Sequence, residues 1–155
     1  MEDALNDFLQ YHARKSHEQG GAKTFLAVSD EPDGMILGFY SLSPASISYN
    51  RTSEVIKRNL ARHDISVFRM GRLAVNLTVQ GKGLGGQLLL SAGKRCLLAA
   101  SEVGGVALLI DAKNDKVARW YQSYGAISLL DTPFHYYYLF QLLRLFLLKL
   151  VSFKL

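Results

Sequence analysis

The sequence contains a single cysteine, Cys96, so disulfide bonds within the chain are excluded. One cysteine is typical of a protein in a reducing compartment. Cys96 falls in the apolar stripe of a predicted helix, which favours a small core residue over a nucleophile. The segment from Met1 to Asp7 is acidic and lacks an apolar stretch, so no secretory signal peptide is visible. We therefore expect a cytoplasmic protein.

Charged residues are also sparse, at 20% of the chain against 49% hydrophobic residues, which excludes an intrinsically disordered chain. A length of 155 residues predicts one domain with a substantial core, and the sequence shows no repeat and no low-complexity linker. The formal net charge of +5 favours acidic partners such as a phosphorylated cofactor or nucleic acid. The alternative interpretation is that the basic residues are scattered over a solvated surface and mark no particular partner.

The segment 139–155 is strongly apolar but contains Arg144, Lys149 and Lys154. It is shorter than the ~20 residues that a membrane-spanning helix needs. A docked helix or a contact between subunits explains it better, and we expect no membrane association. The sequence therefore divides into a domain at 1–138 and an atypical tail at 139–155.

Hydrophobic periodicity and turn residues predict an alternation of helices and strands. We expect helices at 3–17, 53–62, 84–100 and 114–124, and strands at 24–28, 35–42, 67–75, 106–111, 126–130 and 135–141. The pair Ser43-Pro44 is expected to end the second strand, and Asn114 or Asp115 to cap the fourth helix. This order predicts an α/β protein of the mixed α+β type, with helices on the faces of a central sheet.

A glycine-rich segment, Gln80-Gly81-Lys82-Gly83-Leu84-Gly85-Gly86, lies between a predicted strand and a predicted helix. Glycine lets the backbone turn tightly, and a helix N-terminus presents unpaired N–H groups and a partial positive charge. The arrangement predicts a binding site for a phosphate or pyrophosphate group.

Gly81, Gly83 and Gly86 also match the G-x-G-x-x-G spacing of dinucleotide-binding domains. This spacing alone is a weak signal. The motif lies in the middle of the chain, and only about 70 residues follow it, too few for the second half of such a fold.

Three segments together resemble the GNAT family, the GCN5-related N-acetyltransferases: Arg72-Leu73-Ala74-Val75, then Gln80 to Gly85, then Asp111-Ala112-Lys113-Asn114 with Ala118 and Trp120-Tyr121. More narrowly, Gly38 to Pro44 and Gly71 to Val75 are similar to the GNAT toxins of type II toxin–antitoxin systems. Toxins of that group acetylate the amino group of aminoacyl-tRNA and stop translation. The resemblance covers about Asp3 to Phe134.

The resemblance implies a GNAT fold with a mostly antiparallel central sheet, and acetyl-CoA as co-substrate without a metal. The residues that it assigns to acetyl-CoA are Leu73, Ala74, Val75, Gln80, Gly81, Lys82, Gly83, Leu84, Gly85, Gly86 and Asn114. Tyr121 corresponds to the family's general acid, which protonates the departing thiolate. Without the resemblance, ordinary helix packing is the better interpretation of Tyr121. Tyr124, one turn away on the same helix, is the other tyrosine that could be mistaken for the general acid.

No carboxylate or histidine stands out as a general base. An α-amino group has a pKa near ~7.7 and is partly neutral at physiological pH, whereas a lysine amine at ~10.4 demands a base more strongly. The tRNA would be held through its phosphates. The cations nominated for these contacts are Arg14, Lys15, Lys23, Lys57, Arg58, Arg62, Arg72 and Lys94.

Two features depart from the toxin pattern. A strand that usually precedes the first helix is expected to be missing, and the tail from Tyr136 is longer and more apolar than the family's final strand. The partners implied are an aminoacyl-tRNA, an antitoxin of the ribbon-helix-helix type and a second copy in a homodimer. Two alternatives stay open: a GNAT enzyme acting on a protein or small-molecule amine, and a non-catalytic, CoA-binding remnant.

Overall fold

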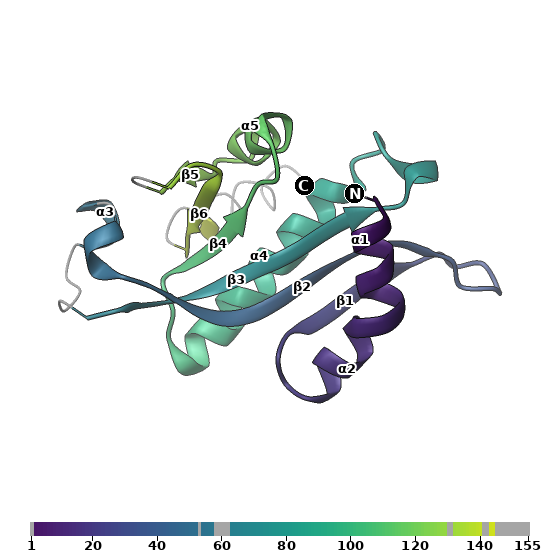
Figure 1. Ribbon diagram of the computed structural model, residues 1–155, viewed down its shortest axis with the longest axis horizontal. Coiled ribbons are helices and arrows are strands. Elements are labelled where there is room, and N and C mark those ends of the chain that lie inside the picture. The colour runs from purple at the N-terminus through teal and green to yellow at the C-terminus, as the bar shows by residue number, and fades with distance from the viewer. Residues whose placement is uncertain (1, 53, 58–62, 130–131, 141–142, 145–155) are drawn as a thin grey trace, which may run out of the picture. The chain divides into compact units, whose positions relative to one another are not determined.

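The computed structural model describes residues 2–52, 54–57, 63–129, 132–140 and 143–144 (Figure 1). Its helical segments are α1 (Glu2–Asp7), η1 (Phe8–His12), α2 (Ala13–Glu18), η2 (Tyr49–Arg51), α3 (Glu54–Lys57), η3 (Leu77–Val79), α4 (Leu84–Val103) and α5 (Asp115–Ser123). Its strands are β1 (Lys23–Val28), β2 (Ile36–Ile47), β3 (Ile65–Val75), β4 (Ala107–Asp111), β5 (Ile127–Ser128) and β6 (His135–Leu139). The six strands form one sheet in the order β1-β2-β3-β4-β6-β5, and the pairs β1–β2, β4–β6 and β5–β6 are antiparallel. The predicted α+β class is confirmed.

The first of two compact units comprises Met1–Pro44 and Met70–Ala92. In it the first helix lies against the β1–β2 hairpin (Figure 1). The Phe8 ring stacks on the Phe39 ring, with 6.1 Å between the ring centroids. The predicted helix at 3–17 contains a π-helical turn, η1. Because a π-helix bonds residues five apart, it brings both Phe8 and Ala13 onto the buried face.

Gly38 of β2 allows the closest approach in this unit. A Cβ atom there would lie 2.8 Å from the carbonyl oxygen of Ala74 in β3 and 2.8 Å from a methyl group of Leu88 in α4. On the same strand, the buried Tyr40 hydroxyl lies 2.8 Å from the Ser91 hydroxyl of α4. Small and paired groups therefore hold β2, the end of β3 and the start of α4 together.

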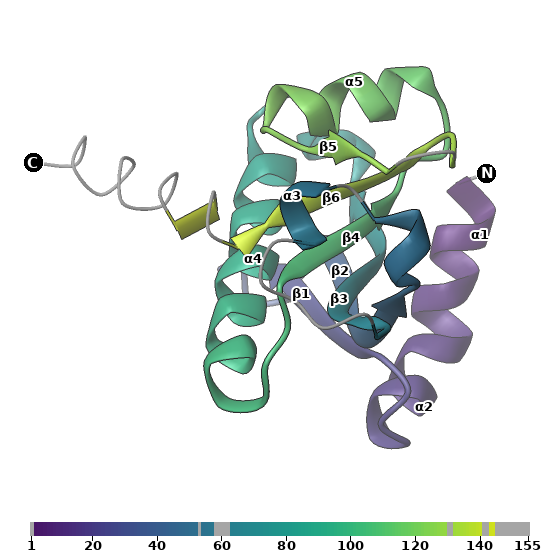
Figure 2. The ribbon, with the colours of Figure 1, turned by 90° about the vertical axis from the view of Figure 1, so that its left-hand side faces the viewer.

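The second unit comprises Ala45–Arg69 and Gly93–Leu155. Its core contains Ile47, Ile65, Val67, Ala107, Leu109, Leu129, Tyr137 and Leu139. The side chains of β4 are buried on both faces from Ala107 to Ile110, as its continuous apolar run predicts. The Tyr138 hydroxyl of β6 donates a hydrogen bond of 2.8 Å to the carbonyl oxygen of Tyr121, which joins α5 to β6. Figure 2 shows α5 close to β5 and β6.

Two predicted boundaries are wrong. Strand β2 does not end at Ser43-Pro44 but runs on to Ile47. Proline has strand-compatible φ and lacks only the N–H group, so a strand tolerates it where that donor is not needed. Of the predicted strand at 126–130, the described residues form only the two-residue strand β5, and residue 130 lies outside the described part.

Other predictions fall partly outside the described residues. Of the predicted helix at 53–62, α3 covers Glu54–Lys57, and residues 53 and 58–62 lie outside the described part. Most of the tail, at 141–142 and 145–155, lies outside it as well. Among the residues that are described, none of the helices has the length and apolar character needed to cross a bilayer.

The single thiol is confirmed as a core group. Cys96 is 1% exposed within α4, and its burial raises the pKa of the thiol to about 12. We expect the folded protein to resist a thiol reagent such as DTNB at pH 8, because both access and thiolate are lacking. The same protein should release one equivalent of chromophore after unfolding in guanidinium. Stoichiometric reaction of the folded protein at a rate typical of free cysteine would contradict the buried placement.

Candidate functional site

The loop between β3 and α4 starts with a cap. Asn76 Oδ1 accepts hydrogen bonds from the backbone N–H and the hydroxyl of Thr78, at 3.0 and 2.9 Å. The backbone N–H of Asn76 donates to the carbonyl oxygen of Leu37 in β2, at 2.8 Å. The short helix η3 is thereby fixed to the sheet of the first unit.

Gln80 closes this loop. Its Nε2 donates a hydrogen bond of 3.0 Å to the carbonyl oxygen of Val75, the last residue of β3. The side chain spans the residues of η3 and returns the chain to the end of the strand. The glycine segment that follows consequently starts from a fixed position.

Gly81 and Gly83 both have left-handed backbone conformations, with φ of 76° and 84°. A Cβ atom at either position would meet no heavy atom within 4 Å, so the space above the backbone is open. Helix α4 starts immediately afterwards at Leu84, and the N–H groups of a first helical turn have no partner within the helix. This turn, which we call the glycine cradle, combines left-handed glycines, the N-terminal donors of a helix and open space above the backbone, and anion binding there stays a prediction.

The first unit holds most of the residues predicted to bind the cofactor. They are Leu73, Ala74 and Val75 on β3, Gln80 to Gly83 in the turn, and Leu84 to Gly86 in α4. The side chain of Lys82 is exposed beside the turn. Asn114 and Tyr121 belong to the second unit.

Asn114 caps helix α5. Its Oδ1 accepts a hydrogen bond of 2.9 Å from the N–H of Val117, which satisfies one of the free donors of the first turn. The sequence predicted this cap correctly. The additional role in cofactor binding stays a prediction.

Tyr121 is 5% exposed on the buried face of α5. Burial raises the pKa of its phenol well above the usual value, and the carboxylate of Asp111 raises it further. Both causes disfavour the phenolate, so Tyr121 holds its proton throughout the physiological pH range. The Trp120 ring contacts both Tyr121 and Tyr124, with centroids at 4.9 and 5.0 Å.

A charged cluster that sequence reasoning missed surrounds Asp111. Arg69 donates to Asp111 Oδ2 through Nε at 3.1 Å and through Nη2 at 2.5 Å. Nε2 of His135 lies 3.3 Å from Asp111 Oδ1, and Asp111 and His135 are register partners in β4 and β6. The only sequence signal for this cluster is that Asp111 and His135 stand at the ends of apolar strands, whereas Arg69 lies within β3.

Both ring nitrogens of His135 face oxygen acceptors. Nδ1 lies 3.0 Å from the carbonyl oxygen of Pro133, and Nε2 faces Asp111. The preceding Phe134 has a left-handed φ of 65°, unusual for a bulky residue, and its carbonyl oxygen accepts from the N–H of Ala112 at 2.8 Å. The ring of His135 is thus held in place as a partner of Asp111.

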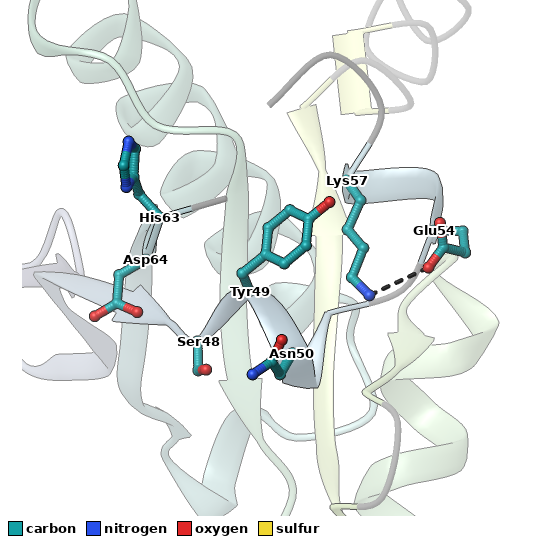
Figure 3. A pocket seen from close by; sticks show the side chains of 7 residues that line it. All are labelled: Ser48, Tyr49, Asn50, Glu54, Lys57, His63 and Asp64. Carbon is teal, nitrogen blue, oxygen red and sulfur yellow. Dashed lines mark hydrogen bonds and ion pairs between the residues drawn. The ribbon is translucent and has the colours of Figure 1, made fainter. Parts of the chain in front are cut away.

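A polar pocket of about 550 Å³ lies elsewhere in the second unit (Figure 3). Its lining residues are Ser48, Tyr49, Asn50, Glu54, Lys57, His63 and Asp64. Lys57 Nζ lies 3.1 Å from Glu54 and 4.9 Å from the centre of the Tyr49 ring. Among these residues the sequence nominated Lys57 alone, and its charge is shared with Glu54.

The remaining cations nominated for tRNA differ in their surroundings. Arg14 pairs with Glu18 at 2.8 Å, and Lys23 Nζ donates to the carbonyl oxygen of His17 at 2.7 Å. The Arg72 guanidinium lies 3.7 Å from the centre of the Phe8 ring. Lys15 and Lys94 are exposed, whereas Arg58 and Arg62 lie outside the described residues.

Within the described part of the chain, no group of three or more His, Cys, Asp or Glu side chains could hold a metal ion. No protein-family model matches the sequence. The sequence is, however, similar to that of a curated protein, the "tRNA-acetylating toxin" of Mycobacterium tuberculosis (strain ATCC 25618 / H37Rv). The two are 35% identical over 120 residues, which are 77% of this chain and 70% of the relative.

Solved structures of similar fold point the same way. The structure of AtaT complexed with acetyl-methionyl-tRNAfMet has a TM-score of 0.89 and 25% identity, covering 95% of this chain and 88% of that one. A tyrosine-to-phenylalanine mutant of the AtaT toxin, bound to the C-terminus of the antitoxin AtaR and acetyl-CoA, has a TM-score of 0.79 and 25% identity, covering 94% and 84%. The chain belongs to the family of tRNA-acetylating toxins, which are acetyltransferases of the GNAT type.

Proposed function

We propose that this protein transfers the acetyl group of acetyl-CoA to the α-amino group of an aminoacyl-tRNA and thereby blocks translation. The observation that carries the proposal is the glycine turn after β3, on a chain 35% identical to a tRNA-acetylating toxin. Residues 1–138 would act as one acetyltransferase domain in the cytoplasm.

The cradle fits the pyrophosphate of acetyl-CoA. Its open space at Gly81 and Gly83 and the first-turn N–H groups of α4 supply donors without a side chain in the way. Backbone groups of Leu73 to Val75 would pair with the pantetheine arm and polarise the thioester carbonyl. The AtaT toxin has been solved with acetyl-CoA bound, which supports the same co-substrate here.

Tyr121 would be the general acid. As the amine nitrogen bonds to the acetyl carbon and the carbon–sulfur bond breaks, sulfur must gain one proton and nitrogen must lose one. Tyr121 gives its proton to the thiolate, and its phenolate takes up the proton from nitrogen. The raised pKa of Tyr121 supports this role, because the donor is then present at every physiological pH.

The substrate amine needs no strong base. An aminoacyl α-amino group is partly neutral near its pKa of ~7.7. His135, the histidine in contact with Asp111, has its two ring nitrogens engaged by the carbonyl oxygen of Pro133 and by Asp111. This arrangement favours an aminoacyl ester over the second candidate, a lysine or small-molecule amine with a higher pKa.

The tRNA backbone would be held by exposed cations, chiefly Lys15, Lys23, Arg72 and Lys94, whose charges are not shared with a carboxylate in the described structure. An antitoxin of the ribbon-helix-helix type would neutralise the toxin, and a homodimer would be its working form. The AtaT toxin binds the antitoxin AtaR, which supports the first of these partners.

The direct test is incubation with labelled acetyl-CoA and total aminoacyl-tRNA. We expect label on the aminoacyl group of one or a few tRNA species, and growth arrest when the protein is expressed. Label that appears only on proteins or small amines would support the second candidate, and absence of acetyl-CoA binding in calorimetry would exclude both.

Replacing Tyr121 by phenylalanine should lower kcat by about 10²–10⁴-fold with little change in acetyl-CoA affinity, because only the proton donor is removed. Tyr124→Phe is the matched control and should retain activity. With Tyr121 present, the rate should rise as pH passes the substrate amine pKa of ~7.7 and should not fall again below pH ~9, because the raised pKa keeps the phenol protonated. An alkaline decline below that pH, or equal losses in both variants, would contradict the assignment.

Gly83→Ala should weaken acetyl-CoA binding, because alanine disfavours the left-handed backbone that forms the cradle. Gly104→Ala is a close control: Gly104 also has φ of 84° and also has nothing within 4 Å of a built Cβ, but it follows the C-terminal end of α4. Both variants should lose about 1–2 kcal/mol of stability from the strained backbone. Calorimetry should show weaker binding only for Gly83→Ala, and equal binding by both variants would exclude the cradle.

A further inference from the structure

Helix α5 has few contacts of its own that fix its position. It has nine residues, and the buried ones are Ala118 and Tyr121. A helix of this length is marginal on its own in water, so contacts from outside must hold it. Its start is capped by Asn114, the residue just before it. The bonds at its other end therefore decide how firmly Tyr121 is held.

The end of α5 is a glycine turn of the Schellman type. Gly125 has a left-handed φ of 90°, and its N–H donates to the carbonyl oxygen of Gln122 at 2.9 Å. The N–H of Ala126 donates to the carbonyl oxygen of Tyr121 at 3.2 Å, as this motif requires. The N–H of Tyr124 donates to the same Tyr121 oxygen at 3.0 Å. The carbonyl oxygen of Tyr121 is thus the point at which the closing turn bonds back to the helix.

A further donor reaches this oxygen from the sheet. The Tyr138 hydroxyl of β6 donates to it at 2.8 Å, the shortest of these three bonds. Tyr138 is buried, and burial raises the pKa of its phenol well above the usual value, with the phenols of Tyr121 and Tyr124 raising it further. The hydroxyl therefore keeps its proton, and stays a donor, throughout the physiological pH range.

Strand β6 gives Tyr138 a fixed base. β6 lies between β4 and β5 in the sheet and pairs with both of them. Tyr138 is the register partner of Leu108, which is 1% exposed in β4. The hydrogen bond from Tyr138 consequently ties the mobile part of a short helix, its C-terminal turn, to paired and buried strands.

We propose that Tyr138 is a positioning residue for acetyl transfer: its hydroxyl fixes the end of α5 to β6 and thereby holds the phenol of Tyr121 in line for proton donation. The inference rests on the proposed function, since it takes Tyr121 as the general acid. The phenol oxygen lies at the far end of a long side chain, so a small rotation of the helix end displaces it by a larger distance. A proton donor must lie within hydrogen-bonding reach of the atom that it protonates, and such a displacement slows the transfer.

The kinetic test removes the hydroxyl alone. Tyr138→Phe should lower kcat by about tenfold with little change in the KM for acetyl-CoA, because the glycine cradle is untouched. Tyr136→Phe, at another buried tyrosine of β6, is the matched control and should keep the wild-type kcat. In a Tyr121→Phe background, Tyr138→Phe should cause no further loss, because the group that it positions is absent. An equal loss in that background would indicate general damage and would overturn the inference.

Trp120 supplies a readout that needs no substrate. It is the only tryptophan of the chain, and its ring centroid lies 4.9 Å from that of Tyr121. Tyr138→Phe should shift its emission to the red and increase its quenching by acrylamide, because the end of α5 loosens. Tyr40→Phe, which removes a buried hydroxyl 2.8 Å from that of Ser91 in the first unit, should change neither. Unchanged Trp120 emission and quenching in Tyr138→Phe would contradict the positioning role.

The outcomes separate this inference from the function on which it rests. If Tyr121→Phe is impaired while Tyr138→Phe is as active as the wild type, only the positioning role fails. If Tyr121→Phe stays fully active, the general-acid assignment fails and the positioning role fails with it. Absence of acetyl transfer by the wild type would overturn the proposed function and this role together, even where fluorescence shows that the hydroxyl holds α5 in place.

Discussion

The hydrogen bond from Gln80 Nε2 to the Val75 carbonyl oxygen is the constraint on which the candidate site depends. It returns the chain to the end of β3 after a single turn of η3, which Asn76 caps. From that position, two left-handed glycines lead directly into the first turn of α4. The strand end, the open turn and the free helical donors then lie within a few residues of one another. A phosphate site made of backbone needs this local rigidity, because it has no side chain to adjust.

The parts of the site that could be predicted from sequence are those whose cause is local. A glutamine, three glycines and an apolar run specify a strand–turn–helix, and the Asn114 cap follows from its own side chain. The Asp111–His135 pair could not be predicted, because it depends on the register of β6 against β4. The extension of β2 beyond Pro44 was missed for a related reason: local turn propensity was outweighed by pairing in the sheet.

Two electrostatic influences act on the pKa of Tyr121 in opposite directions: burial and Asp111 raise it, and the positive partners of Asp111 weaken the effect of that carboxylate. Burial and the Asp111 carboxylate keep its phenol protonated, which suits a donor but makes each donation harder. Arg69 and His135 both contact Asp111, and their contacts moderate the negative charge that Tyr121 experiences. A cluster within β3 and at the ends of β4 and β6 therefore bears on the acid on α5, although sequence motifs name only the tyrosine. The left-handed Phe134 beside His135 is consistent with this, since strained backbone persists where surrounding contacts fix it.

The two ends of the sheet are protected differently. At one end β5 is only two residues long, and so short a strand offers little for another chain to pair with. At the other end, β1 has six residues, its Leu26 and Val28 side chains are exposed, and Nδ1 of His17 accepts a hydrogen bond from the N–H of Thr24. The side chain of the preceding helix thus satisfies a backbone donor of β1, which reduces what this edge offers to another chain.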